Sequence, residues 1–372
     1  MNNHNYLDLH VIQTIPPNCV NRDDTGSPKT AFYGGTMRAR VSSQAWKRAM
    51  RQMFKELMPE DILGYRTKHV EELVNECVKT IAPEIPDETR VGTVEKVLHS
   101  IDKTKSNNKA TKKVLSEDVL FFISNLQVKA LAKIVVDYYN ETNIDDEKKK
   151  QYVQSVKDAL KGNPSIDILL FGRMSAGDTF YNYDAAAQVA HAISTHTVSN
   201  EYDYFTAVDD YQQKDTTGAA HIDTTEFNSS TLYRYATVNI SELSKNLTKD
   251  ELSLALKGFT ESFIRSMPTG KQNSFANRTL PNFVYVTIRS DQPANFAGAF
   301  EKPVTSIDGG YVEKSETALI EYANKVYSDY ISRPEKAWVI GKELDDTVDK
   351  VNLIELLSQI EEIAKSCSTE GE

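Results

Sequence analysis

The stretch from Asn21 to Arg51, NRDDTGSPKTAFYGGTMRARVSSQAWKRAMR, joins a polar loop, a Gly-Gly turn, alternating arginines and a basic helix. From Arg22 to Lys55, eight Lys and Arg residues stand against two Asp residues, which leaves a local balance of +6. The whole chain of 372 residues carries a formal charge of −10. A positive segment in an acidic protein predicts that a polyanion binds at one place, with little non-specific binding elsewhere.

The pattern of this stretch predicts a short strand followed by a helix. In residues 37–41, Arg38 and Arg40 alternate with apolar residues, as on the two faces of a strand. Ser42 and Ser43 are both good N-cap residues, so we expect the helix to begin at one of them. Its apolar stripe consists of Trp46, Met50, Met53 and Leu57, and its polar stripe of Gln44, Lys47, Arg51 and Lys55.

Two interpretations of the basic helix remain open on residues alone. In the first, the arginines and lysines follow a sugar-phosphate backbone, while Ser42, Ser43 and the helix N-terminus donate hydrogen bonds to one phosphate. In the second, the helix is an ordinary amphipathic surface helix with solvated charges.

The remaining chain alternates strands and helices around a helical block. We expect a half-buried strand over 5–13 and further strands over 166–171, 232–240 and 283–288. Helices are predicted over 70–81, 93–102, 114–139, 148–160, 184–195, 250–265, 314–331 and 351–365. The last 32 residues carry nine acids and three lysines, which is typical of a solvated tail. This order is compatible with an α+β, ferredoxin-like core that carries a helical insertion.

Composition excludes several classes of protein. No apolar run approaches the roughly 20 residues that cross a bilayer, and the N-terminus lacks the pattern of a signal peptide. Cys19, Cys77 and Cys367 are too scattered for a disulfide framework or a metal knuckle. We therefore expect a cytoplasmic protein without membrane partner, cofactor or metal.

Four local features have a functional and a structural interpretation. Asp23 and Asp24 could hold Mg²⁺ for phosphodiester cleavage, or could close an Asx-type turn. His191 and His196 are five residues apart, unlike the i, i+4 pair of a zinc helix, which favours a structural role. Gly270 before Lys271 permits close approach to a phosphate but is equally typical of a helix C-cap. Residues 201–227 hold seven acids and one lysine, so this segment should meet nucleic acid only through apolar and aromatic side chains.

The chain resembles the CasC family, the repeated backbone subunits of type I-E CRISPR Cascade surveillance complexes. The matching segments, in chain order, are LHVIQTIPPNCVNRDD, FYGGTMRARVSSQAWKRAMR, ILLFGRMSA, AAAQVAHAISTHTV, DYFTAVDD, AHIDTTEFNSSTLYRYATVNI and TGKQNSFAN. They span most of the chain, except the helical insertion and the C-terminal helices.

The resemblance implies a modified RNA-recognition-motif palm (1–60, 165–195 and 229–372), helical fingers (61–164) and an extended thumb hairpin (196–228). Such subunits polymerise along guide RNA with further copies and other Cascade subunits, and present the guide to target DNA. The residues implied in RNA binding are Asn21, Arg22, Lys29, Arg38, Arg40, Ser42, Ser43, Gln44, Lys47, Arg51, Lys271 and Gln272. Met174, Thr206 and Ile222 are implied as wedges at a kink in the RNA.

The resemblance implies a non-catalytic scaffold, because pairing of the guide reads the target and the protein recognises shape and backbone. An enzymatic alternative is open. Type III backbone subunits share this architecture and cut target RNA with a metal held by an aspartate, and Asp23 and Asp24 lie in the corresponding loop.

Overall fold

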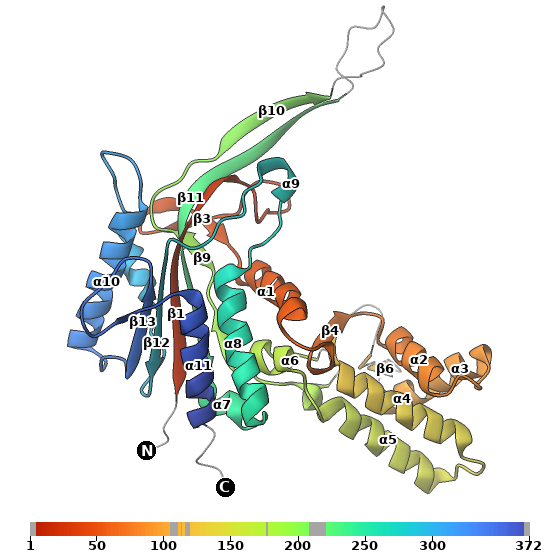
Figure 1. Ribbon diagram of the computed structural model, residues 1–372. Helices are drawn as coiled ribbons and strands as arrows, with labels where there is room; N and C mark the ends of the chain where they lie inside the picture. The colour runs from red at the N-terminus through yellow and green to blue at the C-terminus, as the bar shows by residue number, and fades with distance from the viewer. Residues whose placement is uncertain are drawn as a thin grey trace, which may run out of the picture. The chain divides into compact units, whose positions relative to one another are not determined.

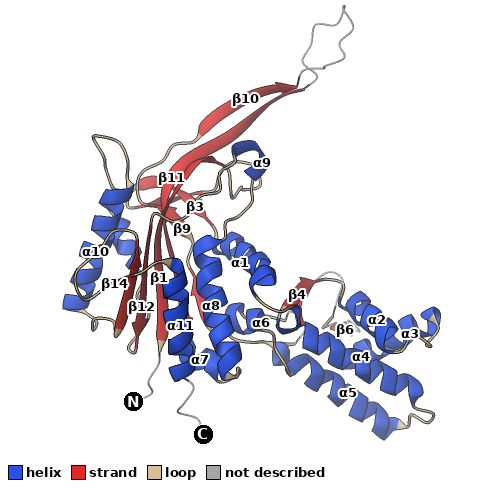
Figure 2. Ribbon diagram, in the orientation of Figure 1, coloured by secondary structure: helices blue, strands red, loops and turns tan. Residues whose placement is uncertain are grey.

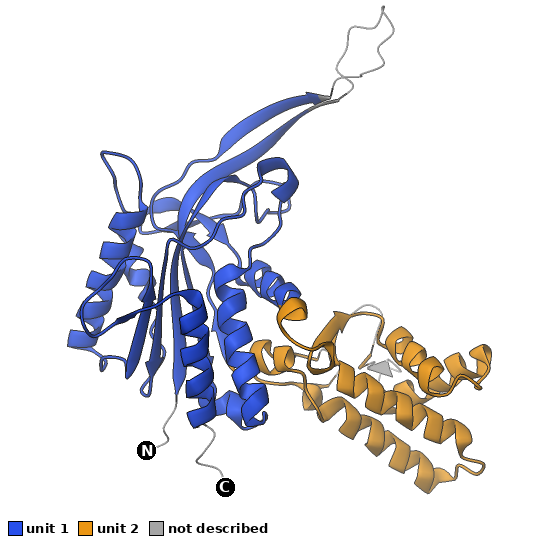
Figure 3. Cartoon of the chain, in the orientation of Figure 1, with its two compact units in different colours: residues 1–53, 187–372 blue, residues 54–186 orange. Residues whose placement is uncertain are grey.

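The computed structural model describes residues 5–104, 111–112, 114–115, 120–175, 178–207 and 221–367. In these ranges the chain is a mixed α and β protein, as the sequence predicted (Figure 2). Two compact units emerge: unit 1 comprises residues 1–53 and 187–372, and unit 2 comprises residues 54–186 (Figure 3). Residues 165–186, expected with the palm, therefore belong to the same unit as the helical block.

Unit 1 contains a large sheet and most of the C-terminal helices (Figure 1). Its strands are β1 (Tyr6–Asn18), β2 (Thr30–Tyr33), β3 (Thr36–Val41), β8 (Ala187–Val189), β9 (Ala192–Ser194), β10 (Glu201–Ala207), β11 (His221–Asn239), β12 (Phe283–Arg289), β13 (Lys336–Ile340) and β14 (Asp349–Lys350). Its helices are α7 (Ile240–Ser244), α8 (Lys249–Arg265), α9 (Gln272–Phe275), α10 (Val312–Asp329) and α11 (Leu353–Cys367), together with most of α1 (Ser43–Leu57).

The strands of unit 1 form one sheet in the order β14-β13-β12-β1-β11-β9-β3-β2, with β8 and β10 also paired to β11. β1 lies in the middle and runs antiparallel to both β11 and β12. Among the described pairs, only β13 with β14 is parallel. The sheet is thus mostly antiparallel, and its centre consists of strands from three distant parts of the chain.

Helices cover both faces of this sheet. On one face, Ile12, Tyr233 and Phe283 pack with Leu319 of α10 and with Phe296. On the other face, the guanidinium of Arg234 (β11) lies against Trp46 of α1 and Phe263 of α8. The prediction of a half-buried strand over 5–13 was wrong in this respect, because β1 is buried on both sides.

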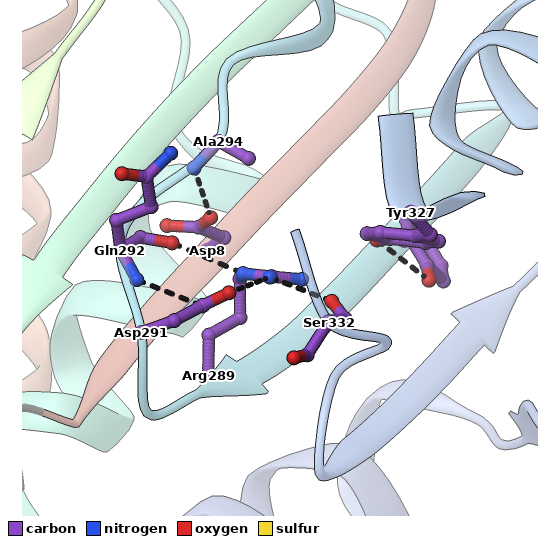
Figure 4. A network of polar contacts seen from close by, with 8 residues as sticks. Asp8, Arg289, Asp291, Gln292, Ala294, Tyr327 and Ser332 are labelled. Atoms are coloured by element: carbon purple, nitrogen blue, oxygen red, sulfur yellow. Dashed lines mark hydrogen bonds and ion pairs between the residues drawn. The ribbon is translucent and has the colours of Figure 1, made fainter. Parts of the chain in front are cut away.

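A buried polar network lies at one end of β1 and β12 (Figure 4). The Asp8 carboxylate accepts hydrogen bonds from the Ala294 N–H at 2.8 Å and the Tyr235 hydroxyl at 3.1 Å. Arg289 binds Asp291 at 2.7 Å and donates to the Ser332 carbonyl at 2.8 Å. Burial raises the pKa of Asp8 to about 6, against the hydrogen bonds and Arg289, which lower it.

The strands β10 and β11 form a hairpin that extends beyond the sheet (Figure 1). β11 has 19 residues, of which Asn228–Asn239 pair with β1 and His221–Phe227 pair with β10. The side chains of Tyr202 and Tyr204 on β10 are 68% and 64% exposed. The predicted strand over 232–240 is therefore only the buried end of a much longer one.

Unit 2 is mainly helical and has its own apolar core. Its elements are β4 (Gly64–Thr67), α2 (Val70–Ile81), α3 (Asp87–Leu98), β5 (Lys103–Thr104), β6 (Thr111–Lys112), β7 (Phe121–Ser124), α4 (Asn125–Asn140), α5 (Asp146–Lys161) and α6 (Ile166–Phe171). Arg173 joins its parts by donating to the carbonyls of Phe122 and Leu160. The predicted helices over 70–81 and 148–160 are confirmed. Of the predicted 114–139 helix, the described residues 121–124 form a strand instead.

Two predicted elements have the opposite secondary structure. Residues 166–171 form helix α6, because a short and mostly apolar segment does not distinguish a buried strand from a buried helix. Residues 184–195 contain β8 and β9, since pairing with β11 and β3 overrides the helix propensity of the alanines. The expected solvated tail is also wrong for α11, where Leu356 and Ile360 are buried, and strand β13 was missed.

Among the helices of the described ranges, none combines the length and apolarity of a membrane span.

Candidate nucleic-acid interface

The loop between β1 and β2 is tied to the start of α1. The backbone N–H of Lys29 donates to the Asn21 carbonyl at 2.9 Å, and the Asn21 side-chain oxygen accepts from the Ser42 N–H at 2.9 Å. Ser42 is the N-cap, since its hydroxyl accepts from the Ala45 N–H at 3.3 Å. Asn21 and Ser42 therefore position the loop and helix, and Ser42 is itself buried.

The two arginines of β3 have different environments. Arg38 is fully buried, and its guanidinium donates to the carbonyls of Ser194 at 2.9 Å and Phe300 at 2.8 Å. Arg40 is partly exposed and donates from Nε to the Thr30 carbonyl at 3.1 Å. The prediction that Arg38 contacts a phosphate backbone does not fit this geometry, because its hydrogen-bonding groups are directed into the protein.

Helix α1 presents its predicted polar stripe outward. Gln44 is exposed and Ser43, Lys47 and Arg51 are partly exposed, whereas Trp46 and Met50 are buried. The first turn carries no acidic residue, so the positive end of the helix dipole is not neutralised by its own side chains. Burial lowers the pKa of Lys47. The helix start and this stripe can thus bind an anion.

The turn before α9 lies against the same loop. A side chain at Gly270 would place its Cβ 2.4 Å from the Val20 carbonyl oxygen, so close backbone approach requires glycine here. The predicted reason for this glycine, approach to a phosphate, is therefore replaced by approach to the neighbouring loop. Lys271 follows with a left-handed φ of 51°. Burial raises the pKa of Cys19 while Arg22 and Lys271 lower it, so both cations lie near this thiol.

Unit 1 thus carries five at least partly exposed cationic side chains on the continuous segment of the loop, β3 and α1, which we call the basic surface: Arg22, Lys29, Arg40, Lys47 and Arg51. Asn21, Lys29 and Arg40 line one small pocket between the loop, β3 and β11. Lys271 and the partly exposed Gln272 lie on the adjoining turn. This arrangement can neutralise successive phosphates without reading bases.

The predicted wedge residues lie elsewhere. Thr206 is exposed on β10 and pairs with Ile222 of β11. The side chain of Ile222 is outside the described residues. Met174 belongs to unit 2 and its side chain is 86% exposed.

The two aspartates of the loop have different surroundings. The Asp23 carboxylate accepts hydrogen bonds from the N–H groups of Thr25 and Ser27, both at 3.0 Å, as in an Asx-type turn. Asp24 is exposed. In the described part of the chain, no group of three or more His, Cys, Asp or Glu residues is arranged to hold a metal.

The two histidines also differ. His196 is buried, stacks on Tyr311 at 3.8 Å and accepts from the Thr231 N–H at 3.1 Å, which is a structural role. His191 is exposed, and its Nδ1 lies 3.1 Å from a guanidinium nitrogen of Arg40. The sequence interpretation gave His191 a structural role, on a predicted helix that the structure replaces by β8 and β9. No sequence signal indicates this contact, because Ile193, two residues further on, pairs with Arg40 only in the folded sheet.

Chains of this architecture occur in solved structures. One, described as "CRISPR RNA-guided surveillance complex, pre-nicking", matches with a TM-score of 0.79 and 28% identity over 96% of this chain and 100% of that chain. Another, described as "CRISPR RNA-guided surveillance complex", matches with a TM-score of 0.61 and 25% identity over 97% and 99% of the two chains. The fold is thus similar to that of chains in RNA-guided surveillance complexes.

The chain belongs to the CT1975-like protein family, whose model matches residues 7–366. No curated protein matches the chain.

Proposed function

We propose that this chain is a non-catalytic backbone subunit of a type I-E CRISPR Cascade complex in the cytoplasm. It binds guide RNA through phosphates, polymerises with further copies of itself beside other Cascade subunits, and presents the guide for pairing with target DNA. The observation that carries the proposal is the basic surface, a set of cations on the loop, β3 and α1 of an acidic protein, of which Lys29 and Arg40 line one pocket. The similarity to surveillance-complex chains over nearly the full length supports it.

The topology of unit 1 supports an RNA-recognition-motif palm. Four of its strands run in the order β12-β1-β11-β9. Along the chain, α1 lies between β1 and β9, and α8 lies between β11 and β12. This is the connectivity of a ferredoxin-like β-α-β-β-α-β unit. The basic surface lies on the segment that joins its first two strands.

The other two parts of the proposed hand also have counterparts. Unit 2 would be the fingers, and the hairpin of β10 and β11 would be the thumb. Glu201, Asp203 and Asp223 lie on the same face of the hairpin, so this face is acidic. Such a face is repelled by phosphates, so Thr206 and the tyrosines of the other face are the groups that would meet bases.

The hydrogen bonds of Asp23 support the non-catalytic proposal, because they engage its carboxylate within its own loop. The alternative is a type III-like subunit that cleaves target RNA with a metal at Asp23 and Asp24. Incubation of the assembled particle with complementary RNA and Mg²⁺ separates the two. Cuts at regular spacing that vanish in Asp23→Ala would replace our proposal by the alternative.

Native mass spectrometry of the protein from its own host, with sequencing of co-purified RNA, tests the scaffold role. We expect a multi-copy complex that carries one short RNA with repeat-derived ends. A nucleic-acid-free monomer, with the partner subunits present, would refute the proposal.

The double variant Lys47→Ala, Arg51→Ala tests the basic surface. We expect weaker RNA binding for all guide sequences alike, and a salt slope lower by up to about 2. Lys245→Ala, Lys249→Ala removes the same charge from exposed positions at α7 and α8 and should leave binding close to wild type. Loss that depends on the guide sequence would contradict contact through the backbone alone.

A further inference from the structure

His191 lies in the turn between β8 and β9, beside two cations of the basic surface. Its Nδ1 lies 3.1 Å from a guanidinium nitrogen of Arg40, and Arg40 is further held by the Thr30 carbonyl at 3.1 Å. The Arg40 backbone N–H donates to the Lys29 carbonyl at 2.9 Å, which fixes the loop against β3. The side chains of Arg40 and His191 thus meet, while Lys29 lines one pocket with Arg40 and is a cation that acts on the His191 ring.

The protonation of His191 follows from this geometry. A guanidinium can only donate, so Nδ1 accepts, and the neutral imidazole carries its proton on Nε2. Burial, then Arg40, then Lys29 lower the pKa of His191. The charged groups that act on the ring, from β3 and from the loop, are both cations, so a proton on Nδ1 is disfavoured until an anion arrives.

We propose that Lys29, Arg40 and His191 form one binding site for a phosphate group of the RNA backbone, in which neutral His191 holds Arg40 through Nδ1 before the phosphate binds and His191 donates to the phosphate from Nε2. The inference rests on the proposed function and extends it to a residue that neither charge counting nor motif matching selected. Protonation of Nδ1 removes the acceptor of Arg40, and the guanidinium is then released toward the phosphate. Bound phosphate and protonated His191 therefore favour each other.

The expected consequence is RNA binding that strengthens in mild acid. A phosphate that raises the pKa of His191 by one unit tightens binding about tenfold once the pH lies below both pKa values. Binding must strengthen as the pH falls, because the RNA-bound protein takes up a proton at His191. An uncharged donor at this position would keep the hydrogen bond without the pH dependence.

The test is fluorescence anisotropy of the full chain with a labelled single-stranded RNA, at constant salt, from about pH 7.5 to about pH 5.5. The variants are His191→Gln, which keeps an uncharged donor, and His191→Ala, which removes it. We expect His191→Gln to bind within about twofold of wild type at the upper pH and to lose most of the gain that wild type shows in acid. His191→Ala should be weaker at every pH. The matched control is His69→Gln, an exposed histidine of unit 2, which should keep the wild-type profile.

The outcomes separate the two proposals. If His191→Gln keeps the wild-type pH profile, or His191→Ala binds as wild type, the phosphate site is refuted, even where Lys47→Ala, Arg51→Ala still weakens binding. If wild type and all variants fail to bind RNA, the proposed function itself is refuted.

Discussion

Replacing His10 by Phe is expected to make unit 1 more resistant to acid. His10 is fully buried, and its ring stacks on Phe296 at 4.5 Å. Its Nδ1 meets the Tyr233 hydroxyl at 2.9 Å, whereas its buried Nε2 has no hydrogen-bond partner in the described structure. Phe fills the same space without the unsatisfied nitrogen, and the Tyr233 hydroxyl keeps the Phe296 N–H as a donor at 3.0 Å.

The magnitude follows from the linkage between protonation and folding. Burial, then Arg289, lowers the pKa of His10 to about 3, against about 6.5 in the unfolded chain. At pH 5 the unfolded chain is protonated at this residue and the folded chain is not, which costs the fold about 2 kcal/mol that is absent at neutral pH. The free energy of unfolding of His10→Phe, relative to wild type, should therefore rise by about 2 kcal/mol between pH 7 and pH 5.

Asp8 supplies a test of the opposite sign from the same strand. Its pKa is raised to about 6 by burial, so the stability it contributes is present in acid and is lost as the pH rises through about 6. Replacing Asp8 by Asn should lower the free energy of unfolding relative to wild type by about 1 kcal/mol between pH 7 and pH 5. In the wild type the Asp8 contribution therefore offsets about half of the His10 contribution.

Urea unfolding followed by tryptophan fluorescence measures both variants. Trp46 and Trp338 are the two tryptophans of the chain, and both are buried in unit 1, so the signal reports this unit alone. A difference between His10→Phe and wild type that is the same at both pH values would show that the reasoning is wrong.

Two further predictions concern the hairpin and the turn between β2 and β3. Thr206→Asp should shorten assemblies, measured by native mass spectrometry, while the unfolding of unit 1 stays as in wild type; assemblies of normal length would count against the thumb assignment. Gly34→Ala should destabilise unit 1 by about 3 kcal/mol or more, because φ is +57° and the new Cβ would lie 1.6 Å from the Glu301 carbonyl oxygen. Gly35→Ala, with a φ of +75° and no atom within 4 Å, should cost only about 1 kcal/mol in the same urea titration, and equal losses would contradict the argument.

Local signals predicted helix α1, which carries Lys47 and Arg51 of the basic surface. Ser42 as N-cap and the stripe with Trp46 and Met50 were visible because capping and helical periodicity act within a few residues. Residues 184–195 were mispredicted for the opposite reason. Their strand pairing depends on β11 and β3, which lie far away in sequence, and alanine composition carries no trace of those partners.

The candidate site shows the same limit. Arg38 and Arg40 have the same charge and alternate on one strand, so sequence assigned them one role. Only the sheet order shows that Arg38 faces the carbonyls of Ser194 and Phe300, while Arg40 faces His191. The contact between Arg40 and His191 spans 151 positions of the chain and has no sequence signature.

β11 is a single strand of 19 residues, about 60 Å long, that contains neither glycine nor proline. One end is clamped between β1 and its other neighbours in the sheet, and the free end forms half of the hairpin. Because no glycine or proline interrupts the strand, nothing in β11 serves as a hinge. The direction of the hairpin therefore follows the twist of the sheet. In the proposed polymer, the buried residues of each subunit would then determine the helical pitch. Substitutions at buried positions of β1 and β11 would change the pitch without altering any surface between copies.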